Sequence, residues 1–263
     1  MRRATIAVLA TVVMLAGCTP RSPAPSAPSG AATGLPTAQQ IFAALAHRRE
    51  AIRSLRALAR LSYASPEESR KARQLVVAER PDRLRFEILS PFGSVFVLTA
   101  ADGSLAAWVR SESTVYRGTA SPENLQRYVQ VDLPVTTAVD ILLATPPLHS
   151  DVDSVVSNDG AAIELWQDAG DTVQVAWLTP TLEPLRYEQR ADDGQVLLRA
   201  TFGEYATIDG QRVPTQLGIE LPPSQRRIEI ALSETEVNPP LAEAVFALET
   251  PAGSKVVDMD DAE

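Results

Sequence analysis

The stretch VPTQLGIEL, residues 213–221, alternates apolar and polar side chains with the two-residue period of a β-strand. The same alternation occurs in RLRFEI, residues 83–88, and in RIEIALS, residues 227–233. Each pattern predicts an antiparallel strand with one face on a core and the other in water. Asp-Gly pairs, which favour tight hairpin turns, follow such runs at 102–103, 159–160, 193–194 and 209–210. We therefore expect a mainly β (α+β) fold in which one long meander forms a sheet.

Three other segments have helical spacing. Residues 37–53 carry apolar side chains at helical intervals behind Thr37, which is a favoured N-cap residue. Ser121 precedes a proline that suits the first helical position, and residues 136–144 form a short apolar run between prolines. We expect an N-terminal helix and a mid-chain helical lid that covers one face of the sheet.

The N-terminus predicts export. Residues 1–17 combine two arginines with an apolar run of about 13 residues, too short to cross a ~30 Å hydrocarbon core. The run ends in Leu-Ala-Gly-Cys at 15–18, which resembles the bacterial lipobox, so the resemblance implies cleavage before Cys18 and lipidation of Cys18. The alternative is an ordinary signal peptide with an incidental cysteine. Thr19, in place of Asp, favours the periplasmic face of the outer membrane by resemblance to sorting signals.

The remaining boundaries follow from composition. Residues 18–36 are rich in Pro, Ser, Ala and Gly and predict a disordered tether between the lipid and the folded part. One acyl chain holds a membrane marginally, whereas two or more hold it stably. We expect one domain over residues 37–258 and an acidic tail over residues 259–263.

Charge and cysteine content exclude several classes of function. The net charge is -9, and loss of Arg2 and Arg3 with a signal peptide would leave -11. Nucleic-acid binding requires a basic surface, which this chain lacks. A single cysteine excludes an internal disulfide and a multi-thiolate metal site. We expect a monomer that does not bind nucleic acid.

No pattern in the chain favours catalysis. The two histidines, His47 and His149, lack the spacing of a zinc motif. The aspartates in 151–159 lack calcium-loop spacing because Val155 and Val156 intervene. Nucleophile-elbow, Walker and dinucleotide motifs are absent from the sequence. We expect no enzyme, no metal and no cofactor.

Several short segments resemble a known family. FEILSPFGS, residues 86–94, resembles the strand-loop-strand of the LolB outer-membrane lipoprotein receptors, and residues 125–147 resemble their mid-chain helical segment. Residues 210–214 and 237–251 are similar to the wider LolA/LolB group of periplasmic lipoprotein carriers. The longer C-terminal end is closer to LolA-like proteins, so both subfamilies stay open. The resemblance spans roughly residues 37–258.

This resemblance implies a curved antiparallel half-barrel, closed by helices, that encloses an apolar cavity for acyl chains. The alternation of the strands sets which side chains face inward. The alternative is an ordinary core that side chains fill. The cavity residues that the resemblance implies are Leu84, Phe86, Ile88, Phe96, Leu98, Leu105, Val109, Leu217 and Ile219.

The resemblance also implies a role for Phe92, an apolar residue in the turn Ser-Pro-Phe-Gly at 90–93. In the family the corresponding residue is exposed and helps to deliver cargo into the membrane, whereas the alternative is that Phe92 folds back onto the sheet. The implied function is an outer-membrane lipoprotein that takes acylated lipoproteins from a LolA-like periplasmic carrier and helps to insert them. The rival is a lipid-binding or scaffolding envelope lipoprotein of the same fold.

Overall fold

The computed structural model describes residues 34–150, 152–158 and 160–261. The predicted signal peptide, the predicted lipidation site Cys18 and most of the tether lie outside the described residues. All described helices and strands belong to the unit Leu35–Glu263, which has its own hydrophobic core. This unit therefore has what a domain needs to fold by itself.

The described residues form three α-helices, fourteen strands and three short 3-10 turns. The helices are α1 (Ala38–Ala51), α2 (Pro122–Val129) and α3 (Val135–Leu142). The strands are β1 (Ser54–Ala64), β2 (Ser69–Glu79), β3 (Arg83–Ser90), β4 (Gly93–Ala101), β5 (Ser104–Val109), β6 (Thr114–Thr119), β7 (Ser154–Asn158), β8 (Ile163–Asp168), β9 (Thr172–Leu178), β10 (Pro184–Ala191), β11 (Val196–Ile208), β12 (Gln211–Leu221), β13 (Arg226–Val237) and β14 (Lys255–Asp258). The turns are η1 (Arg110–Glu112), η2 (Pro222–Ser224) and η3 (Glu243–Phe246).

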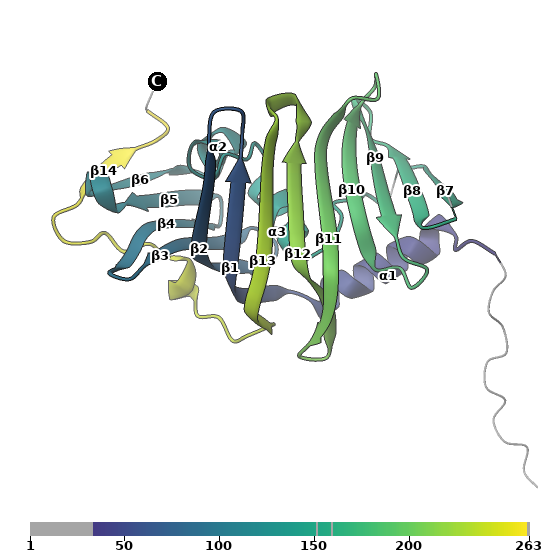
Figure 1. Ribbon diagram of the computed structural model, residues 1–263, viewed down its shortest axis with the longest axis horizontal. Helices are drawn as coiled ribbons and strands as arrows, with labels where there is room; N and C mark the ends of the chain where they lie inside the picture. Colours follow the sequence, from purple (N-terminus) through teal and green to yellow (C-terminus); the bar gives the residue numbers. More distant parts are fainter. Residues whose placement is uncertain (1–33, 151, 159, 262–263) are drawn as a thin grey trace, which may run out of the picture. The chain divides into compact units, whose positions relative to one another are not determined.

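All the strands join one open, curved sheet, in the order β14-β6-β5-β4-β3-β2-β1-β13-β12-β11-β10-β9-β8-β7 (Figure 1). The prediction of a mainly β fold with an N-terminal helix and mid-chain helices is confirmed. The mid-chain helices divide the predicted meander into two runs of strands. β1–β6 run outward from the centre to one edge, and β7–β13 run inward from the other edge until β13 pairs with β1. The segment that contains α2 and α3 carries the chain from one edge to the other.

The helices lie behind the sheet in the view of Figure 1, so the sheet has a helix-covered inner face and an outer face. α3 contacts β2 and β3, and α1 contacts β7. The core is continuous between the inner face and the mid-chain helices, because alternate residues of each strand point to the same side. Within the described residues, no helix is both long and apolar enough to cross a membrane.

Local sequence explains where the helices begin. Thr37 caps α1, since its hydroxyl accepts from the backbone N–H of Gln40 at 3.2 Å while the Gln40 side chain accepts from the backbone N–H of Thr37. Ser121 caps α2 in a similar way, through the backbone N–H of Asn124 at 3.2 Å. α3 starts directly after Pro134, one residue before the predicted 136–144. Both predicted caps are confirmed.

The C-terminal end of the described chain, up to the start of the predicted acidic tail at residues 259–263, is packed against the sheet. β14 pairs in parallel with β6, and the next residue, Met259, is 1% exposed in the core. Asp260 then accepts hydrogen bonds from the backbone N–H of Thr119 at 2.9 Å and from the side chain of Asn124 at 2.6 Å. β14 thus covers the β6 edge of the sheet (Figure 1), and Asp260 joins the end of the chain to β6 and α2.

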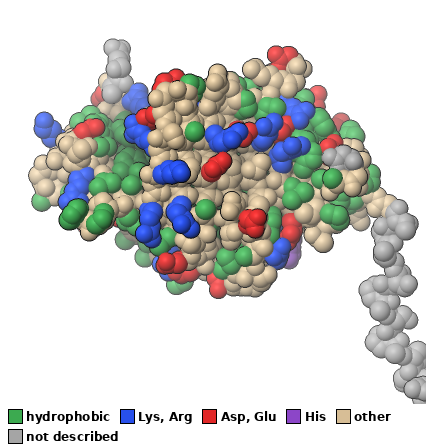
Figure 2. Space-filling view, in the orientation of Figure 1, with side chains coloured by type: hydrophobic (Ala, Val, Ile, Leu, Met, Phe, Trp, Pro, Cys, Tyr) green, Lys and Arg blue, Asp and Glu red, His purple; other side chains and the backbone are tan. Residues whose placement is uncertain are grey.

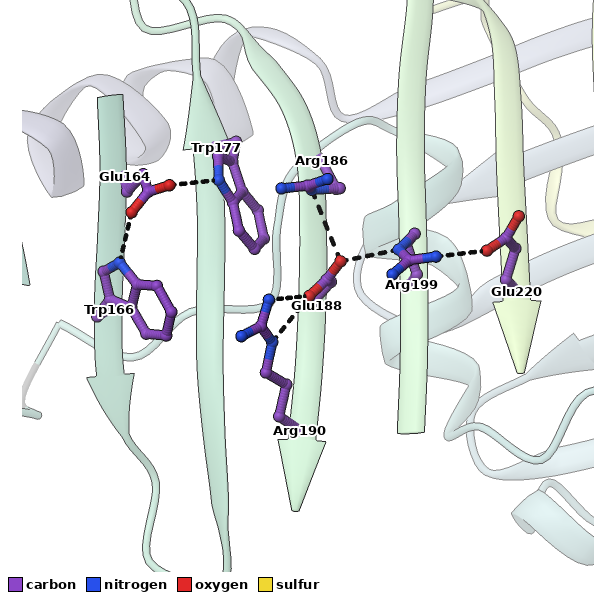
Figure 3. A network of polar contacts seen from close by, with 8 residues as sticks. All are labelled: Glu164, Trp166, Trp177, Arg186, Glu188, Arg190, Arg199 and Glu220. Atoms are coloured by element: carbon purple, nitrogen blue, oxygen red, sulfur yellow. Dashed lines mark hydrogen bonds and ion pairs between the residues drawn. The ribbon is translucent and has the colours of Figure 1, made fainter. Parts of the chain in front are cut away.

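The outer face of the sheet is charged, with basic and acidic side chains interspersed over the central strands (Figure 2). Glu188 on β10 is 1% exposed and accepts hydrogen bonds from Arg190 and Arg199, both at 2.8 Å (Figure 3). The guanidinium of Arg186 lies 3.7 Å from the ring centroid of Trp177. These contacts bind β9, β10 and β11 together on the side of the sheet away from the helices.

Candidate functional site

A cleft of about 800 Å³ lies between the inner face of the sheet and the mid-chain helices. Its floor comes from strands on both sides of the β1–β13 joint, and its roof, residues 122–143, consists of α2, α3 and their linker. Side chains therefore fill only part of the space between the sheet and the helices. This observation favours a binding cavity over a fully packed core.

The structure brings six of the nine predicted cavity residues to the wall of this cleft. These are Leu84, Phe86, Ile88, Phe96, Val109 and Ile219. The other three, Leu98, Leu105 and Leu217, are buried in the packed core and do not line the cleft. The alternation of their strands predicts the correct face of the sheet for these three residues. It does not predict which part of that face is packed in the core and which part lines the cleft.

The sequence prediction missed part of the cleft wall. Leu61 and Tyr63 on β1 and Ile228 and Ile230 on β13 line the cleft at the centre of the sheet. The two isoleucines belong to the alternating stretch at residues 227–233, so their position in that alternation predicts that they face the same side of the sheet. The roof contributes Leu125, Tyr128, Leu133 and Leu142.

Aromatic contacts close one side of the cleft. The ring of Tyr128 on α2 stacks on Phe96 of β4 with centroids 6.3 Å apart, and it also contacts Tyr116 of β6 at 5.6 Å. Burial raises the pKa of Tyr128 to about 12. The cleft is thus an environment that disfavours charge.

The roof is fastened at both ends. At the end of α3, Arg80 donates to Asp140, to the hydroxyl of Thr145 at 2.8 Å and to the carbonyl of Ile52 at 3.1 Å. At α2, Arg127 donates to the carbonyl of Met259 at 2.8 Å. The linker between the helices lies between these two points. Arg226 of β13 also donates to the carbonyl of Gln130 in this linker at 3.5 Å, so the roof is held at its middle as well.

The mouth of the cleft is polar. Arg70 and Glu68 form an ion pair of 2.5 Å there, and Lys71 and Glu112 lie on the same rim. A ligand that fits both regions would place an apolar part inside and a polar or charged part at the mouth.

Phe92 is 87% exposed at the tip of the β3–β4 hairpin, so it does not fold back onto the sheet. The turn itself is fixed, because Ser90 donates to the carbonyl of Gly93 at 2.7 Å and Arg110 donates to the carbonyl of Phe92 at 3.0 Å. Leu89, on the same hairpin, is 40% exposed. In Figure 2, apolar side chains are visible at the end of the sheet where Figure 1 shows this hairpin.

A second recess, of about 570 Å³, lies between α1 and α3. Its wall is mixed, with Phe42 and Leu45 beside Asp140, His149 and Gln174. Neither histidine of the chain belongs to a metal-binding group, since no three His, Cys, Asp or Glu residues of the described chain lie close enough to share a metal ion.

Solved structures share this fold. A LolA superfamily protein from Nitrosomonas europaea superposes with a TM-score of 0.56 at 17% identity, covering 81% of this chain and 99% of that one. A putative outer membrane lipoprotein-sorting protein domain from Vibrio parahaemolyticus gives 0.54 at 15% identity, covering 78% and 94%. The chain has a LolA-like fold.

A third structure with the same fold is a DUF1329 family protein from Desulfovibrio piger, with a TM-score of 0.55 at 16% identity, covering 80% of this chain and 96% of that one. No family model and no curated protein matches the sequence. The LolA-like likeness therefore concerns the three-dimensional arrangement alone.

Proposed function

We propose that this protein is a lipid-anchored envelope protein that holds acyl chains of lipoproteins in the cleft and helps to insert them in the outer membrane. The observation that carries the proposal is the apolar cleft of about 800 Å³ under a roof fastened at both ends. A LolA superfamily protein and a lipoprotein-sorting domain with the same fold support it. The proposed role is binding without catalysis, as a monomer, on the periplasmic face.

The size of the cleft fits this role. A methylene group takes up roughly the 30 Å³ that one water molecule has in the liquid, so a sixteen-carbon chain needs roughly 480 Å³. The cleft thus has room for one full chain and part of another. Leaving about 45 methylenes of a triacylated protein in water would cost roughly 35 kcal/mol, so such a cargo needs shelter.

Loose fit also serves release. A lipid bilayer competes with the cleft for the acyl chains of the cargo. An acyl chain leaves the cleft only when the bilayer binds it more tightly than the cleft does. In the proposal, the cargo comes from a LolA-like carrier, and lipidated Cys18 keeps this protein at the receiving membrane.

The test uses residues 35–263 behind a cleavable export signal that is not lipidated, purified from the periplasm of a bacterium that makes lipoproteins. Mass spectrometry of the copurified material identifies what the cleft holds. Acylated polypeptide is the expected result. Free lipid alone would favour a lipid-binding protein of the same fold instead, and an empty protein that also fails to bind a synthetic lipopeptide would contradict the proposal.

We predict that Phe92→Glu leaves folding unchanged and reduces transfer of bound lipopeptide to vesicles by roughly tenfold or more. Burying a phenylalanine side chain is worth about 1.5–3 kcal/mol, and each 1.4 kcal/mol is a factor of ten. Fluorescence transfer to vesicles measures the rate. The matched control is Val155→Glu on edge strand β7, since Val155 is also exposed, at 67%, but lies at the far end of the sheet. Equal transfer by both variants would remove the role of Phe92.

A further inference from the structure

Gln74 is a buried polar residue in the middle of β2, on the inner face of the sheet. Its neighbours across the strands are Ala59 on β1 and Ile88 on β3, both apolar. The residue is 4% exposed and lines the cleft. Its Nε2 has no hydrogen-bond partner among the described residues.

Nothing in the structure explains an unpartnered N–H donor at this place. Buried side-chain donors in proteins are nearly always paired, because an unpaired donor retains the full cost of leaving water. A leucine or methionine at residue 74 would pack on Ala59 and Ile88 without that cost. The terminal torsion of a glutamine is soft, so the amide can turn its N–H toward a group that enters the cleft.

The chemistry of an acyl ligand supplies the missing acceptor. An alkyl chain has no hydrogen-bonding atom, whereas an ester or amide that joins the chain to its carrier has a carbonyl oxygen. Gln74 lies four residues inward from Arg70 at the mouth, which is about 13 Å along the strand. This distance leaves space for a glyceryl or cysteinyl linker between the carbonyl and the charged rim.

We propose that Gln74 donates a hydrogen bond to the carbonyl oxygen of an ester- or amide-linked acyl chain. The cleft then selects acyl groups over alkyl groups of the same length, and the bond sets how deep the chain enters. This inference rests on the proposed function, since it names the chemical class of ligand for the same cleft.

The test compares two synthetic lipopeptides. One has a dipalmitoylglyceryl group on an N-terminal cysteine, and the other has the dihexadecyl ether in its place, so the two differ only in the ester carbonyls. Residues 35–263 should bind the ester roughly five- to tenfold more tightly than the ether, as expected for one net hydrogen bond. Displacement of a fluorescent fatty-acid probe gives both affinities.

Gln74→Leu should bind the two lipopeptides equally, because it removes the donor and keeps the apolar wall. The matched control is Gln174→Leu, since Gln174 is also a buried glutamine, 7% exposed, but lines the second recess between α1 and α3. This control should keep the preference for the ester.

The outcomes separate the two proposals. Equal affinity of the unmodified protein for ester and ether would overturn the role of Gln74 and leave the proposed function standing. A preference that survives in Gln74→Leu would overturn it as well. Failure of the unmodified protein to bind either lipopeptide would contradict the proposed function, and the inference with it. The comparison of ester and ether affinities uses the unmodified protein, so it tests the role of Gln74 even if a variant fails to fold.

Discussion

Asp140 on α3 is a buried carboxylate that receives two arginines from other elements. Arg49 of α1 donates to it at 2.7 Å, and Arg80, from the β2–β3 turn, donates to the same oxygen. The side chains of Arg80 and Asp140 are both 9% exposed. Burial lowers the pKa of Arg80 to about 10, with Asp140 acting in the opposite direction, so the arginine keeps its charge at neutral pH. One carboxylate thus joins the roof to the rest of the core.

We predict that Arg80→Met lowers the free energy of unfolding by about 3–5 kcal/mol, because it leaves Asp140 charged in the core with Arg49 as its remaining partner. Urea denaturation measures the loss. The matched control is Arg56→Met, whose pair with Glu236 has side chains 40% and 49% exposed and should contribute about 1 kcal/mol or less. Similar losses in both variants would show that the buried pair does not hold the roof.

Glu188 gives the outer face a dependence on pH. Burial raises its pKa, but hydrogen bonds from Arg199 and Arg190 outweigh burial, so the pKa lies below its ordinary value. The carboxylate therefore stabilises the fold above the unfolded-state pKa of about 4.3, and this stability is lost as the pH falls through the lower native pKa.

We predict that Glu188→Gln loses less stability than the unmodified protein when the pH falls from about 6 to about 3, because each pKa unit between the states is worth about 1.4 kcal/mol. The variant is less stable at pH 6 from the start, since the three arginines near residue 188 lose their shared acceptor. Denaturation curves at several pH values test this. If the stability of both proteins fell equally with pH, the role of Glu188 would be contradicted. The control is Glu236→Gln on β13, whose carboxylate is exposed in its pair with Arg56.

At the scale of elements, β14 covers an edge that the chain would otherwise leave open. It pairs with β6 through Lys255–Asp258, and all four of its side chains are exposed, so the backbone makes the contact. An uncovered edge strand is a template for pairing with another chain.

We predict that deleting residues 254–263 lowers stability and causes self-association through β6. The control is Met259→Ala, which keeps β14 but empties a buried position, and it should lose roughly 2–5 kcal/mol without associating. Light scattering separates the two variants. A monodisperse deletion variant would show that β14 does not protect the edge.

The elements that could be predicted are those with local signals. Thr37 and Ser121 cap their helices through bonds to residues three positions away, and the strand at 213–221 alternates without a break. β14 could not be predicted, because four exposed residues carry no alternation. Met259 lies within an acidic segment, and the contact that buries it comes from a distant part of the chain.

At the scale of the whole molecule, the sequence predicts a curved sheet with helices on one face but not the order of its strands. Alternation predicts the face of the sheet to which a side chain points, but it does not identify the strand that pairs with it. The same limit explains the cleft, since Phe86 and Leu98 share a face of the sheet while the cleft reaches only Phe86. The apolar surroundings of Gln74 could not be predicted for the same reason, because only the pairing of β1, β2 and β3 places it between Ala59 and Ile88.

The joint between β1 and β13 pairs the first strand of the chain with a strand near its C-terminal end. Leu55 pairs with Val237, so the two partners are far apart in the chain, and contacts of long sequence separation form slowly. Until β13 pairs with β1, the chain therefore has only one half of the cleft that the complete sheet forms.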